Sequence, residues 1–103
     1  MEVGIDTTRI SRFTKKSEQF IKKILTEREY KTYISLDEKQ RVVYLAVRWA
    51  CKEAIFKATQ DKDYFKYTIL NYESGKPYVL DYEKYKLSIT HEGDYVTAIV
   101  IVE

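Results

Sequence analysis

The sequence DEKQRVVYLAVRWACKEAIFKA, residues 37–58, predicts one long helix. Asp37 is a favourable N-cap residue, and apolar residues follow it at the spacing of one helical face. This apolar stripe consists of Val42, Leu45, Ala46, Trp49 and Ala50. One further turn brings Glu53 to the edge of the stripe. A carboxylate on a buried face is costly unless it is paired or binds a metal ion, so Glu53 is the first candidate functional residue.

The residues on either side of this helix predict an α+β fold, with helices first and an antiparallel sheet after them. Residues 8–23 are expected to be helical or turn-like, and a capping box at Thr26 and Glu29 opens a short helix over 26–35. The predicted strands are 2–7, 66–72, 78–80, 86–91 and 95–102. We expect the short N-terminal strand and the helices, with the long helix packed on the C-terminal antiparallel sheet, to form one domain spanning residues 1–103.

The last strand, 95–102, is apolar on both faces except at Thr97. Such a strand is expected to be buried on both sides, either by the rest of the chain or by a neighbouring subunit. A chain of 103 residues has little material with which to cover both sides.

Cysteine usage and hydropathy limit the cellular setting. The only cysteine is Cys51, so no internal disulfide is possible, which is typical of a reducing cytoplasm. No apolar run approaches the roughly 20 residues of a membrane span, and residues 1–6 do not resemble a signal peptide. We therefore expect a cytoplasmic protein without a membrane partner.

Charge is unevenly distributed along the chain. Residues 1–62 carry 14 basic and 9 acidic residues, whereas residues 63–103 carry 4 and 7. This asymmetry predicts an acidic partner for the basic half; a solvated helix face is the simpler alternative. The densest basic stretch consists of Arg9, Arg12, Lys15, Lys16, Lys22 and Lys23.

Three polar positions, Asp6, Glu53 and His91, suggest chemistry. Two carboxylates brought together could hold one Mg²⁺, which prefers oxygen ligands and keeps waters and substrate phosphates in its shell. Lys57 lies one turn after Glu53, where a cation would suit a phosphate site. Taken alone, the spacing of Glu53 and Lys57 favours an ordinary salt bridge, Asp6 could cap a helix, and His91 could be hydrogen-bonded at a hairpin.

Five motifs, in order along the chain, resemble those of the short, holo-synthase group of the 4'-phosphopantetheinyl transferases. They are Gly4-Ile5-Asp6, Ile24-Leu25-Thr26 before Glu29, Arg48 to Ala58, Gly75-Lys76-Pro77, and Ser88-Ile89-Thr90-His91. The resemblance implies transfer of 4'-phosphopantetheine from coenzyme A to a serine of apo-acyl carrier protein. This reaction releases adenosine 3',5'-bisphosphate and would serve fatty acid biosynthesis.

The resemblance also implies roles for individual residues. Asp6 and Glu53 would hold Mg²⁺, and together with Lys57 they would be the catalytic residues. The residues implied in coenzyme A binding are Arg48, Lys52, Lys57, Lys76, Pro77 and His91. The basic stretch from Arg9 to Lys23 would dock the acidic carrier protein. The family further implies a homotrimer with sites between subunits and no nucleic acid partner.

Three departures from the family pattern are visible. Residues 59–63 contain no glycine, whereas the family has glycines there whose backbone amides approach phosphate. Glu92 replaces a hydroxyl residue after His91, and Thr8 is unusual after the first motif. Two other functions remain open: a non-catalytic module that binds RNA or an acidic protein, and an inactive relative.

Overall fold

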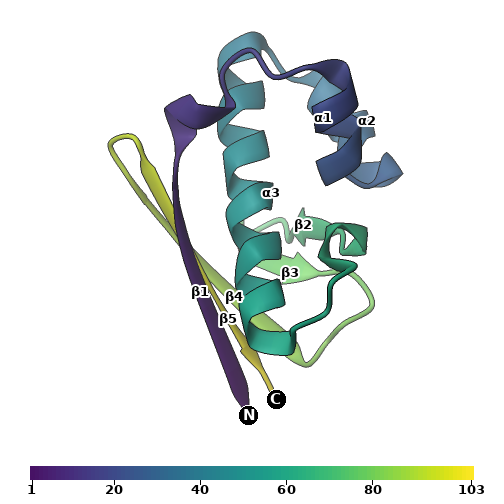
Figure 1. The fold of residues 1–103 in the computed structure, drawn as a ribbon, viewed down its shortest axis with the longest axis vertical. Helices are drawn as coiled ribbons and strands as arrows, with labels where there is room; N and C mark the ends of the chain where they lie inside the picture. The colour runs from purple at the N-terminus through teal and green to yellow at the C-terminus, as the bar shows by residue number, and fades with distance from the viewer.

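The long helix predicted from residues 37–58 is α3 (Glu38–Thr59), and it forms the middle layer of the molecule (Figure 1). A computed structural model describes all residues, 1–103. A three-stranded antiparallel sheet packs on one side of α3, and the shorter elements lie on its other side (Figure 1). In chain order, the elements other than α3 are β1 (Glu2–Arg9), η1 (Ile10–Phe13), α1 (Glu18–Ile24), α2 (Glu27–Ser35), η2 (Tyr64–Lys66), β2 (Ile69–Asn71), β3 (Pro77–Val79), β4 (Tyr85–Glu92) and β5 (Tyr95–Val102).

The predicted helix starts are confirmed by their caps. The side chain of Thr26 accepts a hydrogen bond from Glu29 N, and the side chain of Glu29 accepts one from Thr26 N. Asp37 and Gln40 form the same reciprocal capping box at the start of α3. Each box satisfies backbone donors that the first helical turn cannot satisfy itself. These two boundaries therefore follow from residues within four positions of one another.

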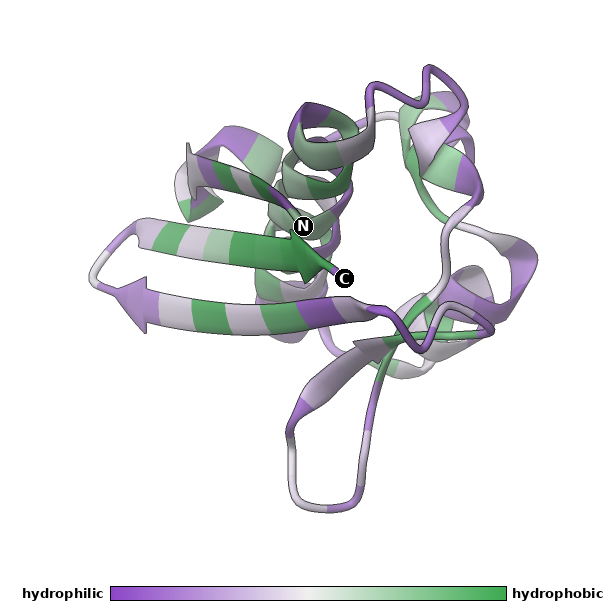
Figure 2. Cartoon of the chain, turned by 90° about the horizontal axis from the view of Figure 1, so that it is seen from below, coloured by the Kyte–Doolittle hydropathy of each residue, from purple (hydrophilic) through white to green (hydrophobic).

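The three-stranded sheet has the order β1-β5-β4, so the C-terminal strand lies between the first strand and β4. Its face toward α3 includes the buried residues Val96, Ala98 and Val100 of β5. The other face carries Ile99 and Ile101, which pair with Ile5 and Val3 of β1. The middle strand is the most continuously apolar of the three (Figure 2). The prediction that β5 is buried on both faces is met on one face only, because nothing in the single chain covers the second.

A smaller two-stranded sheet, β2-β3, is separate from the main sheet, and the turn between its strands contains Gly75. Strand β2, 69–71, is shorter than the predicted 66–72, in part because Lys66 belongs to the 3-10 helix η2. Strand β3, 77–79, lies one residue before the predicted 78–80. None of the helices combines the length and the apolar character that crossing a membrane requires.

Candidate active site

Gly4 allows β1 to approach α3 more closely than any other residue would. A Cβ atom at this position would lie 1.9 Å from Ala54 O and 2.8 Å from Ala58 N. Both partners are backbone atoms of a helix, so they cannot move aside as a flexible side chain could. The close approach places Asp6, which is two residues along β1 on the same face of the strand, beside the last turns of α3.

Asp6 and Lys57 form an ion pair at this contact. Lys57 Nζ lies 3.0 Å from Asp6 Oδ1 and donates a second hydrogen bond to Ile5 O, also at 3.0 Å. The Asp6 side chain is 14% exposed, whereas that of Lys57 is 52% exposed. The structure therefore joins the predicted strand carboxylate to the predicted helix cation, and one side of the ammonium group remains open to solvent.

Glu53 lies one turn before Lys57 and is half-buried, as its position at the edge of the apolar stripe predicts. Its neighbour is Tyr64 of η2. Burial raises the pKa of the Tyr64 phenol, and so do a hydrogen bond with Glu53 and the negative charges of Glu53 and Asp6. Both carboxylates therefore lie close enough to Tyr64 for their charges to affect its ionisation. The Tyr64 ring packs against Phe56 and Phe65, with centroid distances of 5.0 and 4.5 Å.

The structure contains no group of three or more His, Cys, Asp or Glu side chains that could hold a metal ion. Asp6 and Glu53 supply two carboxylates. Lys57 bonds to Asp6 Oδ1 and leaves the second oxygen of Asp6 without a protein partner. This donor set fits Mg²⁺, which usually takes one or two carboxylates from the protein and completes its shell with water and substrate phosphate.

Lys52, expected from the resemblance to contact coenzyme A, lies inside the fold. Its side chain is fully buried, and Nζ donates to Ile24 O at 2.7 Å, Glu29 Oε1 at 2.5 Å and Phe65 O at 3.1 Å. An ammonium group has three protons, so none is left for a ligand. In this structure Lys52 is therefore a structural cation, and its contact with coenzyme A stays an untested expectation. Burial lowers its pKa, and the Glu29 carboxylate opposes that shift.

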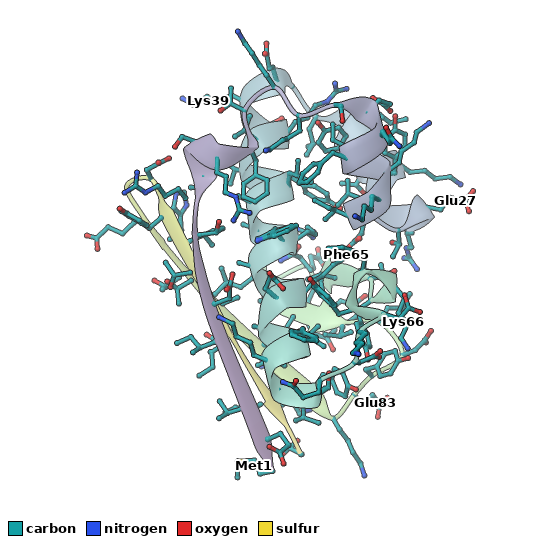
Figure 3. All side chains as sticks on the ribbon, in the orientation of Figure 1. Met1, Glu27, Lys39, Phe65, Lys66 and Glu83 are labelled. Atoms are coloured by element: carbon teal, nitrogen blue, oxygen red, sulfur yellow. The ribbon has the colours of Figure 1, made fainter.

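Glu29 completes this internal pair. It is fully buried, and its Oε1 accepts from Thr26 N as well as from Lys52, while Oε2 accepts from Ile69 N at 2.9 Å. Lys52 and Glu29 thus connect the end of α1, the start of α2, η2 and β2 to α3. Figure 3 shows Phe65 on the side of α3 that faces away from the three-stranded sheet, where this connection lies.

Arg48 is also buried, at 7% exposure, and does not reach the Asp6–Lys57 pair. Its Nη2 donates to Ile69 O at 2.9 Å and to Asn71 Oδ1 at 3.0 Å. Its role as a direct coenzyme A ligand is therefore not supported by its position. Lys76 is exposed and Pro77 is half-buried, both beside the turn between β2 and β3, where a ligand could reach them.

His91 is exposed near the end of β4, and its only hydrogen bond joins Nε2 to Gly93 O at 3.2 Å. Strand β5 separates β4 from β1, so the backbones of β4 and β1 lie roughly 10 Å apart. No hydrogen bond or ion pair connects His91 to Asp6, Glu53 or Lys57. Within one chain, therefore, the structure brings together the three predicted catalytic residues and leaves His91 apart.

The basic stretch is distributed over the end of β1, η1, the following loop and α1. The Arg12 guanidinium lies 4.9 Å from the centre of the Trp49 ring, and Trp49 is one turn before Glu53 on α3. A partner that binds Arg12 would therefore lie close to Glu53. All six residues of the stretch are exposed except Lys16, which is half-buried over the ring of Phe20.

A model of the 4'-phosphopantetheinyl transferase superfamily matches residues 2–100. The chain belongs to this superfamily. The holo-[acyl-carrier-protein] synthase of Mycoplasmoides gallisepticum is 45% identical over 98% of this chain and 95% of its own length. That of Mycoplasma mobile is 40% identical over 96% of this chain and 86% of its own length.

Solved structures of transferases from this family have the same fold. A holo-(acyl-carrier-protein) synthase from Bacillus anthracis, in complex with CoA (3',5'-ADP), superimposes with a TM-score of 0.86 at 28% identity, covering 99% of this chain and 95% of that chain. The synthase of Plasmodium yoelii has a TM-score of 0.83 at 30% identity, covering 96% and 91%. The family predicted from the five motifs is therefore confirmed, and so is the α+β fold.

The loop that lacks the family glycines uses its backbone amides internally. Asp61 N donates to Thr59 Oγ1 at 3.1 Å, and Asp63 N donates to Asp61 Oδ1 at 3.0 Å. Hydrogen bonds from Tyr67 and Lys66 hold the pKa of the Asp61 carboxyl at about 2. These two amides are therefore occupied by side chains of the loop.

Gln60, the C-cap residue of α3, has a φ of 61°, in the left-handed region that glycine adopts without strain. Replacing Gln60 with glycine is expected to stabilise the protein by up to about 1 kcal/mol. Chemical denaturation would measure this change. Lys62→Gly is the matched control, because Lys62 lies in the same loop without a positive φ, and it should destabilise. A destabilised Gln60→Gly variant would show that the left-handed conformation is not strained.

Three functional or supporting residues were not assigned a role from sequence alone. Gly4 was part of a motif, but its packing against α3 was not foreseen. The sequence identifies Glu29 as a capping residue but not as the partner of Lys52. Its place in one of the five motifs is the only signal in the sequence for a further role. Tyr64 carried no signal, because its position next to Glu53 depends on how η2 folds back onto α3.

Proposed function

We propose that this chain transfers 4'-phosphopantetheine from coenzyme A to a serine of apo-acyl carrier protein and releases adenosine 3',5'-bisphosphate. The observation that carries the proposal is the cluster of Asp6, Lys57 and Glu53 at the junction of β1 and α3, where Gly4 permits the close approach. The family assignment supplies the reaction, and the cluster supplies the groups that the reaction requires.

The chemistry is a phosphoryl transfer. The serine oxygen forms a bond to the phosphorus that carries the pantetheine arm, and the bond from that phosphorus to the bridging pyrophosphate oxygen breaks. The leaving adenosine 3',5'-bisphosphate takes the bonding electron pair. The half-buried Glu53 carboxylate, one turn before Lys57 on α3, would accept the serine proton. Lys57 neutralises charge on the leaving phosphate.

Mg²⁺ would be held by Asp6 and Glu53. When bound, it would neutralise pyrophosphate charge and orient the phosphates. Lys57 fixes the direction of the Asp6 carboxylate by bonding one of its oxygens. Cys51 takes no part in this chemistry, because it is buried and burial raises its pKa to about 12. A single free thiol also suits a reducing cytoplasm.

The reaction is tested by incubating the protein with coenzyme A, Mg²⁺ and apo-acyl carrier protein and weighing the carrier. A mass gain equal to one phosphopantetheinyl group is the expected result. A carrier of unchanged mass, with coenzyme A still bound by the protein, would indicate an inactive relative. An unchanged carrier without any coenzyme A binding would favour the non-catalytic binding module.

Replacing Arg12 with glutamate is expected to raise the KM for carrier protein severalfold and to leave the KM for coenzyme A nearly unchanged. An acidic carrier is steered by exposed cations, and this effect weakens at high salt, where the Debye length falls to about 3 Å at 1 M. Steady-state kinetics at low and high salt would measure it. Arg28→Glu, which changes an exposed arginine of α2 outside the basic stretch, is the control. Equal effects of Arg12→Glu on both substrates would contradict a docking role.

The active assembly is proposed to be a homotrimer with sites between subunits. The number three comes from the family. Two observations support an oligomer: Val3 and Ile5 of β1 are 58% and 55% exposed on the uncovered sheet face, and His91 does not reach the catalytic cluster of its own chain. A contiguous exposed apolar surface of this kind is typical of a protein interface. In the trimer, His91 of one subunit would bind the coenzyme A held by the cluster of its neighbour.

Mixing two inactive variants tests this arrangement. His91→Ala and Glu53→Ala chains, refolded together, are expected to recover part of the activity, because some interfaces then pair an intact His91 with an intact Glu53. Each variant refolded alone is the control, and it should stay inactive. Mixed oligomers without activity would show that His91 and Glu53 act within one subunit.

A further inference from the structure

The turn between β2 and β3, which carries Lys76 and Pro77, is connected to the middle of α3 through two side chains. Arg48 leaves α3 and donates from Nη2 to the backbone oxygen of Ile69 and to Asn71 Oδ1, at 2.9 and 3.0 Å. Asn71 then donates from Nδ2 to Gly75 O at 2.9 Å. The path therefore runs from Arg48 through Asn71 to the turn.

The direction of the Asn71 amide is fixed by its two neighbours. A guanidinium group only donates hydrogen bonds, and a backbone carbonyl only accepts them. Asn71 must therefore point its oxygen toward Arg48 and its NH₂ group toward Gly75. This orientation depends on Arg48, whose guanidinium is held against the ring of Tyr44, 3.9 Å from its centroid.

The turn has few other restraints. Residues 71–76 are all exposed, and the strands that flank the turn have only three residues each. An isolated two-stranded hairpin is marginally stable at best. Within the turn, Tyr72 N donates to Lys76 O and Gly75 N donates to Tyr72 O, at 2.9 and 2.8 Å. These bonds shape the turn, and the contact from Asn71 to Gly75 ties it to the body of the protein.

We infer that Arg48 and Asn71 are positioning residues that hold the Gly75-Lys76-Pro77 turn in place for coenzyme A. The inference rests on the proposed function, because it takes coenzyme A as the ligand of this turn. Arg48 acts from inside the fold: it is 7% exposed, and its side-chain link to the turn runs through Asn71. The resemblance implies that Arg48 binds coenzyme A directly. In this inference Arg48 instead positions the turn that binds coenzyme A.

The test is coenzyme A affinity, measured by calorimetry with coenzyme A alone. Asn71→Asp keeps an acceptor for Arg48 and loses the donor to Gly75, and we expect affinity to fall about tenfold while the melting temperature is kept. Ser74→Asp is the matched control, because it adds the same charge to the same turn without removing that donor. An equal fall in both variants would mean that charge alone is responsible and would overturn the inference.

A double-mutant cycle separates positioning from direct contact. If Arg48 acts through Asn71, then Arg48→Lys, Asn71→Ala and the double variant should lose similar amounts of coenzyme A affinity. Their KM for carrier protein should not change. Additive losses would show that Arg48 acts independently of Asn71, against the inference. A wild-type protein that does not bind coenzyme A would refute the proposed function, whereas an Asn71→Asp variant that binds like wild type would refute only the positioning role.

Discussion

Replacing Lys52 with methionine is expected to lower the free energy of unfolding by about 3–5 kcal/mol. The variant leaves the fully buried Glu29 carboxylate without its cation. It also leaves Ile24 O and Phe65 O without the donor that satisfies them, and each orphaned buried group adds to the cost. The loss should release η2 from α3, so Tyr64 would no longer be held beside Glu53.

Chemical denaturation at neutral pH would measure this loss. Lys22→Met is the control, because Lys22 also pairs with a glutamate, Glu18, but its side chain is 62% exposed and the distance is long, at 4.0 Å. Removal of such an exposed pair should cost less than about 1 kcal/mol. Equal losses in the two variants would contradict the structural role of Lys52.

Glu53→Gln is expected to lower kcat by at least about a hundredfold while leaving the fold intact. The substitution keeps the size of the side chain and removes the charge that would hold Mg²⁺ and accept the serine proton. Because Glu53 is half-buried next to Tyr64 and not inside the core, the free energy of unfolding should change little. Asp6→Asn should have a similar effect on kcat, and it should also weaken the contact that Asp6 makes with Lys57.

Initial rates over a range of Mg²⁺ concentrations, together with thermal melts, would check both variants. Glu38→Gln is the control, since it changes an exposed carboxylate at the opposite end of the same helix. Near-normal magnesium-dependent activity of Glu53→Gln would show that the cluster has been assigned wrongly. A large fall in melting temperature would instead mean that Glu53 is needed for folding.

The sequence by itself determined the family and most of the elements, η2 being an exception. The starts of α2 and α3 depend on capping boxes whose members are three residues apart, such as Thr26 and Glu29. The apolar stripe of α3 correctly placed Glu53 at the edge of the buried surface. These features could be predicted because hydrogen bonds within one turn and the helical repeat involve only near neighbours in the chain.

The tertiary structure alone decided which charged residues of α3 face inward. Arg48, Lys52 and Lys57 are all cations of one motif, yet the first two are buried and only Lys57 meets Asp6. A long side chain is directed by the groups packed around it, and here those groups come from distant segments: Glu29 for Lys52, and β1 for Lys57. Sequence spacing gives the helical face of a residue, but its partner depends on how strands and helices far apart in the chain come together in space.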